Sequence, residues 1–260
     1  MYKKLSIIIP VFNEESTIEI LLQKIADTNL IGEIRKELVI VNDGSTDLSN
    51  QKIEFFISKH TNLDFWYIKN KTNKGKGNAI RYGLKIATGD LILIQDADLE
   101  YNPSDYNVML EPILSGEANV VYGSRFLNMN LYKKSYWGHK IINKGITTFS
   151  NWLSGLSLTD IQTCYKLMDA NLLKSIDLCE NRFSFDHELT AKLSKNKFIK
   201  VNEVAISYEG RSYKEKKIGW FDALAAIYAI IRYNKFMKSE KTGMDISSPV
   251  FNLEVNKLAV

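Results

Sequence analysis

Cysteine is scarce in this sequence. Only two cysteines, Cys164 and Cys179, occur in 260 residues. They lie far apart and have no metal-ligand spacing, which argues against a disulfide framework and against a cysteine-bound zinc site. This usage is typical of reduced thiols in a cytoplasmic protein.

The sequence also lacks long hydrophobic runs. The first ten residues, "MYKKLSIIIP", hold only a handful of apolar side chains before Pro10, too few for a signal peptide. No segment approaches the ~18 consecutive apolar residues typical of a membrane-spanning helix. We therefore expect a soluble or peripherally bound protein.

Charge of one sign is not strongly in excess. The chain has 34 basic and 30 acidic side chains, a formal net charge of +4. This modest value favours an anionic small substrate or a membrane surface as partner, and not nucleic acid. A hydrophobic content of 45% excludes a disordered chain and predicts a sizeable core.

Apolar runs and helical patterns alternate along the first half. Strands are predicted at 5–9, 37–41, 65–68 and 91–95, with later strands at 120–122 and 199–207, whereas 125–155 reads as mostly helical. Asn13 is the predicted N-cap of the first helix. The pattern predicts an α/β fold with a Rossmann-like, mostly parallel sheet, flanking helices and a ligand at the carboxyl ends of the strands.

Three carboxylates follow the fourth predicted strand, in "LILIQDADLE". Asp96, Asp98 and Glu100 are spaced two residues apart, and carboxylates are the ligands that Mg²⁺ and Mn²⁺ prefer. The alternative is a solvated acidic turn. Asp43 and Glu14 follow neighbouring strands at the same edge, and such a concentration of negative charge requires a balancing cation or hydrogen-bond donors.

Five ordered stretches resemble one known family: "SIIIPVFNEESTI", "VIVNDGSTDLS", "NKGKGNAIRYGLKIATGD", "QDADLEYNP" and "YGSRF". They resemble the inverting family 2 glycosyltransferases, and within them the dolichol- or polyprenyl-phosphate mannose or glucose synthases, from about Leu5 to about Tyr233. The resemblance implies a single GT-A domain over 1–237, with a nucleotide-sugar half over about 1–124 and an acceptor half over about 125–237. Residues 238–260 are expected to form a loosely docked or frayed C-terminal tail.

The resemblance also implies roles in donor binding. Pro10, Glu14 and Asp43 are expected to contact the nucleoside, and Asp96 and Asp98 to hold a metal on the diphosphate, with Glu100 able to complete the metal site. Lys76 lies in a lysine- and glycine-rich loop that suits an anion cradle, although a solvated loop is the alternative. Arg211 belongs to a basic, aromatic segment that can close over a diphosphate or grip a lipid phosphate.

The acceptor side is predicted with alternatives open. Arg125 is expected to face the acceptor or the diphosphate as a third catalytic residue, and the competing interpretation is a structural salt bridge. Either His139 or Lys140 is expected to contact the acceptor phosphate. Further acceptor-binding candidates are Gln162, Lys166, Glu188 and Lys217.

The predicted reaction is transfer of a hexose from a nucleotide-sugar, of the GDP-mannose or UDP-glucose type, to a polyprenyl phosphate, with Mg²⁺ or Mn²⁺. One alternative is addition of a sugar to a saccharide hydroxyl, which needs a base such as Asp186 or Glu188. Another is a non-catalytic nucleotide-binding module. A nicotinamide dehydrogenase is disfavoured, because "IPVFNEES" lacks G-x-G-x-x-G after the first strand.

The predicted location is cytoplasmic, peripheral at the cytoplasmic face of the membrane. In the helical pattern over 218–236, apolar residues recur at helical spacing beside basic ones. This pattern fits a core-packing helix or, as the alternative, an interfacial helix.

Overall fold

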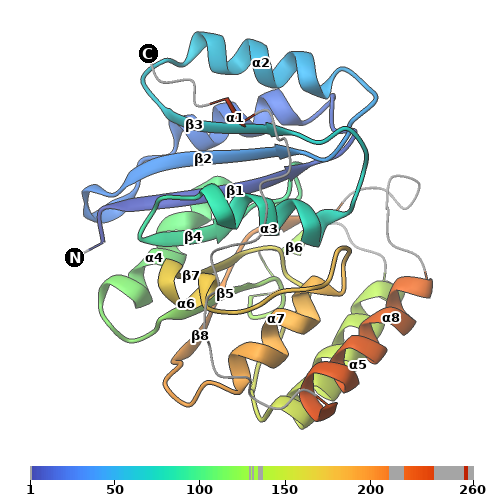
Figure 1. Ribbon diagram of the computed structural model, residues 1–260. Coiled ribbons are helices and arrows are strands. Elements are labelled where there is room, and N and C mark those ends of the chain that lie inside the picture. Colours follow the sequence, from blue (N-terminus) through green and yellow to red (C-terminus); the bar gives the residue numbers. More distant parts are fainter. Residues whose placement is uncertain are drawn as a thin grey trace.

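The computed structural model describes residues 2–128, 130, 132–133, 137–210, 220–236 and 255–256. These residues form an α/β domain around an eight-stranded sheet with the order β10-β3-β2-β1-β4-β7-β5-β8. The predicted fold class, a mostly parallel sheet with flanking helices, is confirmed (Figure 1).

Strands and helices alternate in the first half, as predicted. β1, β2, β3 and β4 are mutually parallel. The central residues of β1, β2 and β4 are fully buried because helices cover the sheet, whereas Trp66 in β3 is partly buried. The elements are β1 (Lys4–Val11), α1 (Ile18–Asp27), η1 (Ile31–Glu33), β2 (Arg35–Asn42), α2 (Ser49–Lys59), β3 (Asp64–Lys69), α3 (Lys76–Ile86), β4 (Leu91–Ile94), η2 (Pro103–Asp105), α4 (Tyr106–Leu114) and β5 (Val120–Ser124).

The second half adds helices and further strands, most of which the sequence did not predict. The elements are β6 (Tyr132–Lys133), α5 (Trp137–Ser154), β7 (Lys166–Asp169), α6 (Ala170–Lys174), α7 (Phe185–Ser194), β8 (Val201–Ala205), β9 (Tyr208–Glu209), α8 (Trp220–Ile231), the π-helical turn η5 (Arg232–Phe236) and β10 (Val255–Asn256). The strands β6, β7, β9 and β10 were not predicted, and among them β7 runs antiparallel between β4 and β5. Its first residue, Lys166, therefore lies at the edge where β4 and β5 end.

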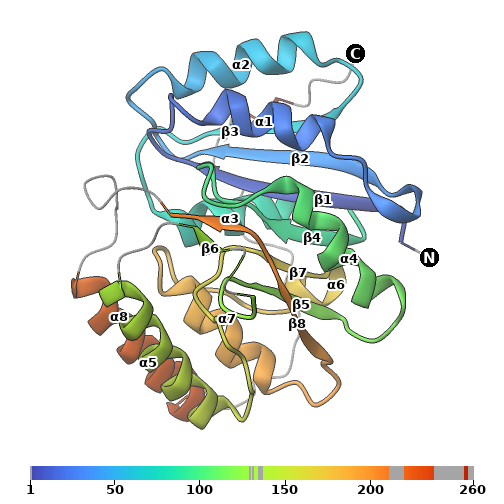
Figure 2. The ribbon, with the colours of Figure 1, turned by 180° about the vertical axis from the view of Figure 1, so that it is seen from behind.

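The helices divide into groups around the sheet. α3 covers one face at β1 and β2, whereas α1 and α2 pack together on the opposite face (Figures 1 and 2). α5 and α8 lie side by side at the end of the domain remote from β1, β2 and β3 in both views. Among the described residues, no helix combines the length and the apolar character that crossing a bilayer requires.

One local prediction needs correction. α1 begins at Ile18 with Thr17 as its N-cap, so Asn13 does not cap it. Instead the Asn13 side chain accepts a hydrogen bond from the backbone N–H of Thr46 at 2.9 Å and joins the loops after β1 and β2. In the predicted tail, Val255 and Asn256 are docked, because they pair antiparallel with β3.

The contact between α3 and β1 requires a glycine at position 83. A Cβ there would lie 2.6 Å from Ile8 Cγ2 in the core. Gly83→Ala is therefore expected to lower the free energy of unfolding by about 1–3 kcal/mol through overpacking. The measurement is the urea denaturation midpoint.

Gly145→Ala is the matched control. Gly145 also lies inside a helix, but apart from the adjoining backbone of that helix no atom of the described residues lies within 4 Å of a Cβ placed there. This variant is expected to raise the free energy of unfolding by about 0.5–1 kcal/mol, since alanine favours the helix. Equal effects of the two substitutions would contradict the close packing of α3 on β1.

Candidate active site

The carboxyl edge of the sheet gathers most of the predicted site. Asp43 directly follows β2, and Arg125 directly follows β5. Asp96 comes two residues after β4. Lys166 joins them from β7, because an antiparallel strand begins where its parallel neighbours end. Pro10 and Glu14 lie at the end of β1 and in the loop after it.

Asp43 anchors the lysine- and glycine-rich loop. Its buried carboxylate accepts hydrogen bonds from the backbone N–H of Gly75 at 2.6 Å and of Lys74 at 3.0 Å, and from Asn70 Nδ2 at 2.8 Å. This carboxylate, predicted to contact a nucleoside, thus holds the loop that precedes α3. Asn70 was not among the predicted site residues.

Gly75 and Gly77 let this loop approach a neighbouring segment. Gly75 has a φ of +100°, and a Cβ at either glycine would collide with the backbone carbonyl oxygen of Asn181 or Glu180. Asn181 O also accepts from the N–H of Asn78 at 3.1 Å. The beginning of α3, which carries Lys76, is therefore held from two sides.

Lys76 and Asp96 form an ion pair at the carboxyl edge. Lys76 Nζ lies 2.7 Å from Asp96 Oδ1, and both side chains are partly buried. Burial by itself lowers the pKa of Lys76, but the charges of Asp96 and Asp186 outweigh it and raise that pKa above its usual value. The lysine is therefore a fixed cation.

Glu14 is linked to the same loop as the acidic pair. Thr17 Oγ1 lies 2.8 Å from Glu14 Oε2 and 3.0 Å from the carbonyl oxygen of Ala97, between Asp96 and Asp98. The loop after β1 is thereby held beside the acidic loop. Glu14 therefore lies beside the loop that carries Asp96 and Asp98.

The acidic loop offers two carboxylates, those of Asp96 and Asp98, for a metal. Asp98 Oδ1 accepts from the N–H of Glu100 at 3.1 Å, while Glu100 Oε2 accepts from the hydroxyl of Tyr208 at 2.8 Å. Among the described residues, no three histidine, cysteine or acidic side chains are grouped closely enough to hold a metal alone. Two carboxylates with diphosphate oxygens and water fit Mg²⁺ or Mn²⁺, which are commonly held that way.

Arg125 forms a structural salt bridge, which is the alternative role that the sequence left open for it. Its Nε and Nη2 atoms lie 2.6 and 2.8 Å from the two carboxylate oxygens of Asp160, which is fully buried. Asn143 Nδ2 of α5 also donates to Asp160, at 3.3 Å, and the guanidinium lies over the ring of Tyr208 at 5.1 Å. This bidentate geometry fixes Arg125 at the end of β5.

Lys166 takes part in a second buried ion pair. Its Nζ atom donates to Asp186 Oδ1 at 2.5 Å and to the carbonyl oxygen of Thr163. Burial raises the pKa of Asp186, but Lys166 and Lys76 outweigh it and hold that pKa below its usual value.

A buried residue that the sequence did not single out, His187, lies beside Gln162, and burial lowers its pKa to about 4.

The buried carboxylate of Glu188 binds other groups of the protein. Its carboxylate accepts from the backbone N–H groups of Cys179 and Glu180, both at 2.8 Å, and pairs with Lys192 Nζ at 2.7 Å. Glu188 therefore fixes the segment at Glu180, whose carbonyl oxygen lies close to Gly77. No residue spacing in the sequence indicates the contact between Glu188 and this segment.

Four acceptor or donor candidates remain. Lys140 is half-buried in α5, and His139 lies in the first turn of that helix. Arg211 and Lys217 lie outside the described residues.

The fold has solved counterparts. The glucosyl-3-phosphoglycerate synthase of Mycobacterium tuberculosis in complex with UDP superposes with a TM-score of 0.69 and 16% identity, covering 91% of this chain and 82% of that one. The same enzyme with Mn²⁺, UDP and glucosyl-3-phosphoglycerate gives a TM-score of 0.67 at 16% identity, with the same coverage. The likeness establishes the shared fold.

Three relatives by sequence are sugar transferases named for polyprenyl phosphates. A dolichol-phosphate mannosyltransferase of Pyrococcus furiosus is 27% identical over 236 residues, covering 88% of this chain and 64% of its own length. An undecaprenyl-phosphate 4-deoxy-4-formamido-L-arabinose transferase of Proteus mirabilis is 25% identical, with coverages of 88% and 67%. A dodecaprenyl-phosphate galacturonate synthase of Rhizobium johnstonii is 24% identical, with coverages of 90% and 68%.

This chain thus spans about two thirds of the length of these relatives. Residues 6–176, which contain the lysine- and glycine-rich loop, the acidic loop and Arg125, match the family Glycosyl transferase family 2. The chain belongs to glycosyl transferase family 2.

Proposed function

We propose that this protein transfers a hexose from a nucleotide-sugar to the phosphate of a polyprenyl carrier, with inversion at the anomeric carbon. The observation that carries the proposal is the meeting of Lys76 and Asp96 at the carboxyl edge of a sheet in a chain of this family. The names of three relatives, which share a polyprenyl-phosphate acceptor but differ in the sugar, support the acceptor class.

On the donor side, Asp96 and Asp98 would hold Mg²⁺ or Mn²⁺ together with the diphosphate oxygens. Solved structures of the same fold that contain Mn²⁺ or Mg²⁺ with UDP support this assignment. When bound, the metal would neutralise charge that develops on the leaving diphosphate. Lys76 supplies a further fixed cation at the same place, and Glu14 lies beside the acidic loop.

On the acceptor side, a phosphate needs no general base, because it is anionic near neutral pH. One of its oxygens attacks the anomeric carbon while the bond from that carbon to the diphosphate breaks, and the nucleoside diphosphate leaves. A saccharide hydroxyl would need a base. The two candidates are engaged elsewhere, Asp186 with Lys166 and Glu188 with backbone amides and Lys192.

The polyprenyl acceptor implies a location at a membrane. We infer peripheral association at the cytoplasmic face, where a nucleotide-sugar and a lipid phosphate can meet. The Arg125–Asp160 pair, with Gln162, Lys166 and either His139 or Lys140, remains the proposed acceptor side. Arg211 and Lys217 remain proposals from the sequence.

A turnover assay tests the reaction. Purified protein is supplied with UDP- and GDP-sugars, with Mn²⁺ or with chelator, and with a polyprenyl phosphate or an oligosaccharide. We expect metal-dependent lipid-phosphate sugar, detected by mass spectrometry. Asp98→Ala should reduce that turnover at least about 100-fold, since stabilisation of the leaving charge is lost, while its circular dichroism stays unchanged. Sugar on the oligosaccharide alone would favour the saccharide-elongating alternative.

A second experiment separates the roles of Lys76. In the absence of nucleotide, the Lys76 ammonium pairs with Asp96 Oδ1 and so competes with a divalent cation for that carboxylate. Lys76→Met should therefore tighten Mn²⁺ binding without nucleotide by about tenfold, yet weaken UDP or GDP binding in the presence of Mn²⁺. Electron paramagnetic resonance of free Mn²⁺ and calorimetry measure the two effects.

Lys74→Met is the matched control for that experiment. It removes the same charge from the same loop, but Lys74 is exposed and its Nζ lies over the ring of Tyr82. It should leave Mn²⁺ affinity nearly unchanged. If Lys76→Met weakened Mn²⁺ binding without nucleotide, the ion pair would not compete with the metal.

A third experiment concerns Arg125. Arg125→Ala leaves the fully buried Asp160 carboxylate without its cation and should lower the free energy of unfolding by about 3–5 kcal/mol. Replacing both residues, Arg125→Met with Asp160→Leu, should cost less than the single substitution, because no charge remains buried. Urea denaturation compares them, and an equal or larger loss in the double variant would contradict a buried pair.

A further inference from the structure

The helices α1 and α2 form a groove on the face of the sheet opposite α3. The groove has a volume of about 380 Å³ and is bordered by both helices, which we call the α1–α2 groove. None of its lining residues belongs to the candidate active site. The lining includes Glu19, Ile20 and Lys24 of α1 and Phe55, Phe56 and Lys59 of α2.

The floor of this groove is fixed by ring contacts, and its rim is apolar. Phe56 is buried, and its ring meets that of Phe65 edge-on, with centroids 6.1 Å apart. His60 stacks on Phe56 with a centroid distance of 3.9 Å. At the rim, Phe55 is 55% exposed and Ile20 is 49% exposed. Two large apolar side chains exposed beside one groove form a small contact surface.

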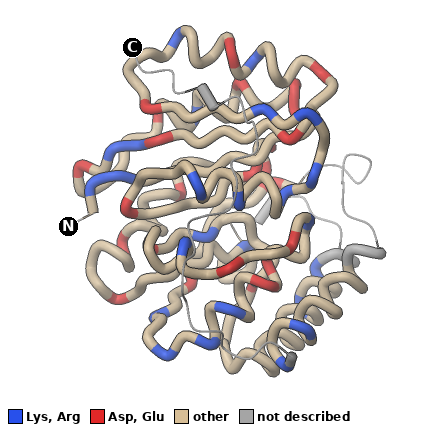
Figure 3. Tube along the Cα trace, viewed as in Figure 1, with Lys and Arg blue, Asp and Glu red and all other residues tan. Residues whose placement is uncertain are grey.

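The charges of the α1–α2 groove differ between its two ends. α1 and α2 each connect two neighbouring parallel strands on the same face of the sheet, so they run in the same direction. Glu19 lies in the first turn of α1, whereas Lys24 and Lys59 lie in the last turns of α1 and α2. The groove is therefore acidic at one end and basic at the other. Figure 3 shows residues of both signs along α2, at the top of the view.

This distribution of charge makes the groove complementary to itself. A two-fold axis through its middle, perpendicular to both helices, would place α1 and α2 antiparallel to the same helices of a second copy. The acidic end of each groove would then meet the basic end of the other. Glu19 would face the end that carries Lys24 and Lys59, and opposite charges that face each other fix the orientation of a contact.

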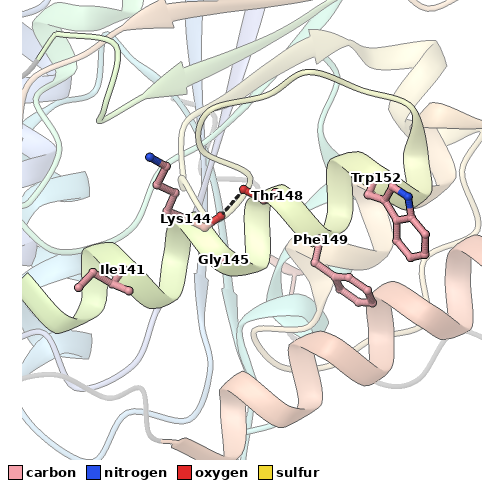
Figure 4. A pocket seen from close by; sticks show the side chains of 6 residues that line it. All are labelled: Ile141, Lys144, Gly145, Thr148, Phe149 and Trp152. Carbon is pink, nitrogen blue, oxygen red and sulfur yellow. Dashed lines mark hydrogen bonds between the residues drawn. The ribbon is translucent and has the colours of Figure 1, made fainter.

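A larger groove, on α5, lacks this complementarity. Its volume is about 580 Å³, and Lys144 is the only charged residue in its lining. In Figure 4, Phe149 and Trp152 point toward α8, whereas Lys144 points to the other side. Two copies that met through this groove would bring like charges together. Charge complementarity therefore favours the α1–α2 groove as a contact between copies of this chain.

We infer that two copies of this chain associate through the α1–α2 groove, with Glu19 of each copy against Lys59 of the other. Helices of 10 and 11 residues offer less than the ~800 Å² per partner of a standard interface, so the expected dissociation constant is on the order of 10 μM. The carboxyl edge with Lys76 and Asp96 stays open, because α1 and α2 cover a face of the sheet. The inference goes beyond the proposed reaction and does not depend on it.

Sedimentation velocity of the full chain, from about 1 to 200 μM, tests the inference. We expect the sedimentation coefficient to rise with concentration toward that of a dimer. Glu19→Lys and Lys59→Glu should each raise the dissociation constant at least about tenfold, since like charges then face each other. The double variant Glu19→Lys/Lys59→Glu exchanges the two charges and should return the dissociation constant to within about threefold of the unmodified chain.

Two charge reversals elsewhere are the matched controls. Glu111→Lys changes an exposed glutamate of α4. Lys85→Glu changes an exposed lysine in the last turn of α3 whose Nζ lies 5.7 Å from the ring centroid of Tyr82, much as Lys59 Nζ lies 5.6 Å from that of Phe55. Both should leave the dissociation constant unchanged, and circular dichroism checks that every variant folds.

Three outcomes would overturn the inference. The first is a monomer at every concentration. The second is a dimer that neither Glu19→Lys nor Lys59→Glu weakens, because the contact would then use another surface. The third is a double variant that associates no better than the single ones, because Glu19 and Lys59 would then not face each other. Turnover is not needed for any of these measurements, so failure of the proposed reaction would leave the result unaffected.

Discussion

A single buried carboxylate, Asp43, fixes the loop on which the rest of the candidate site depends. It accepts the backbone N–H groups of Lys74 and Gly75, and so sets where α3 begins and where Lys76 points. A carboxylate that receives several backbone donors in a buried place is held firmly. The ion pair between Lys76 and Asp96 follows from that placement.

Much of the fold could be predicted from the sequence, because parallel strands buried on both faces are apolar throughout. The runs that form β1, β2 and β4 have this form. β7 could not be predicted. It has only four residues, begins with the charged Lys166 and ends with Asp169, and Lys166 is buried only because Asp186, far along the chain, pairs with it.

The candidate site, too, could be predicted only in part from the sequence. The sequence predicts that Asp96 and Asp98 lie at the edge of the sheet, since their positions depend on one local strand. Whether Arg125 meets a substrate or a carboxylate depends on Asp160, which belongs to a distant loop. Glu188 likewise finds its partners, the N–H groups of Cys179 and Glu180, through tertiary packing. Residue type and local spacing carry no information about such long-range pairs.

The short strand β10 covers part of one edge of the sheet. β3 would otherwise be the outermost strand of the sheet, with a row of backbone N–H and C=O groups available to any other extended chain. Val255 and Asn256 cover part of that row, at Ile68 and Tyr67. Residues from the far end of the chain thus act as a guard against edge-to-edge aggregation.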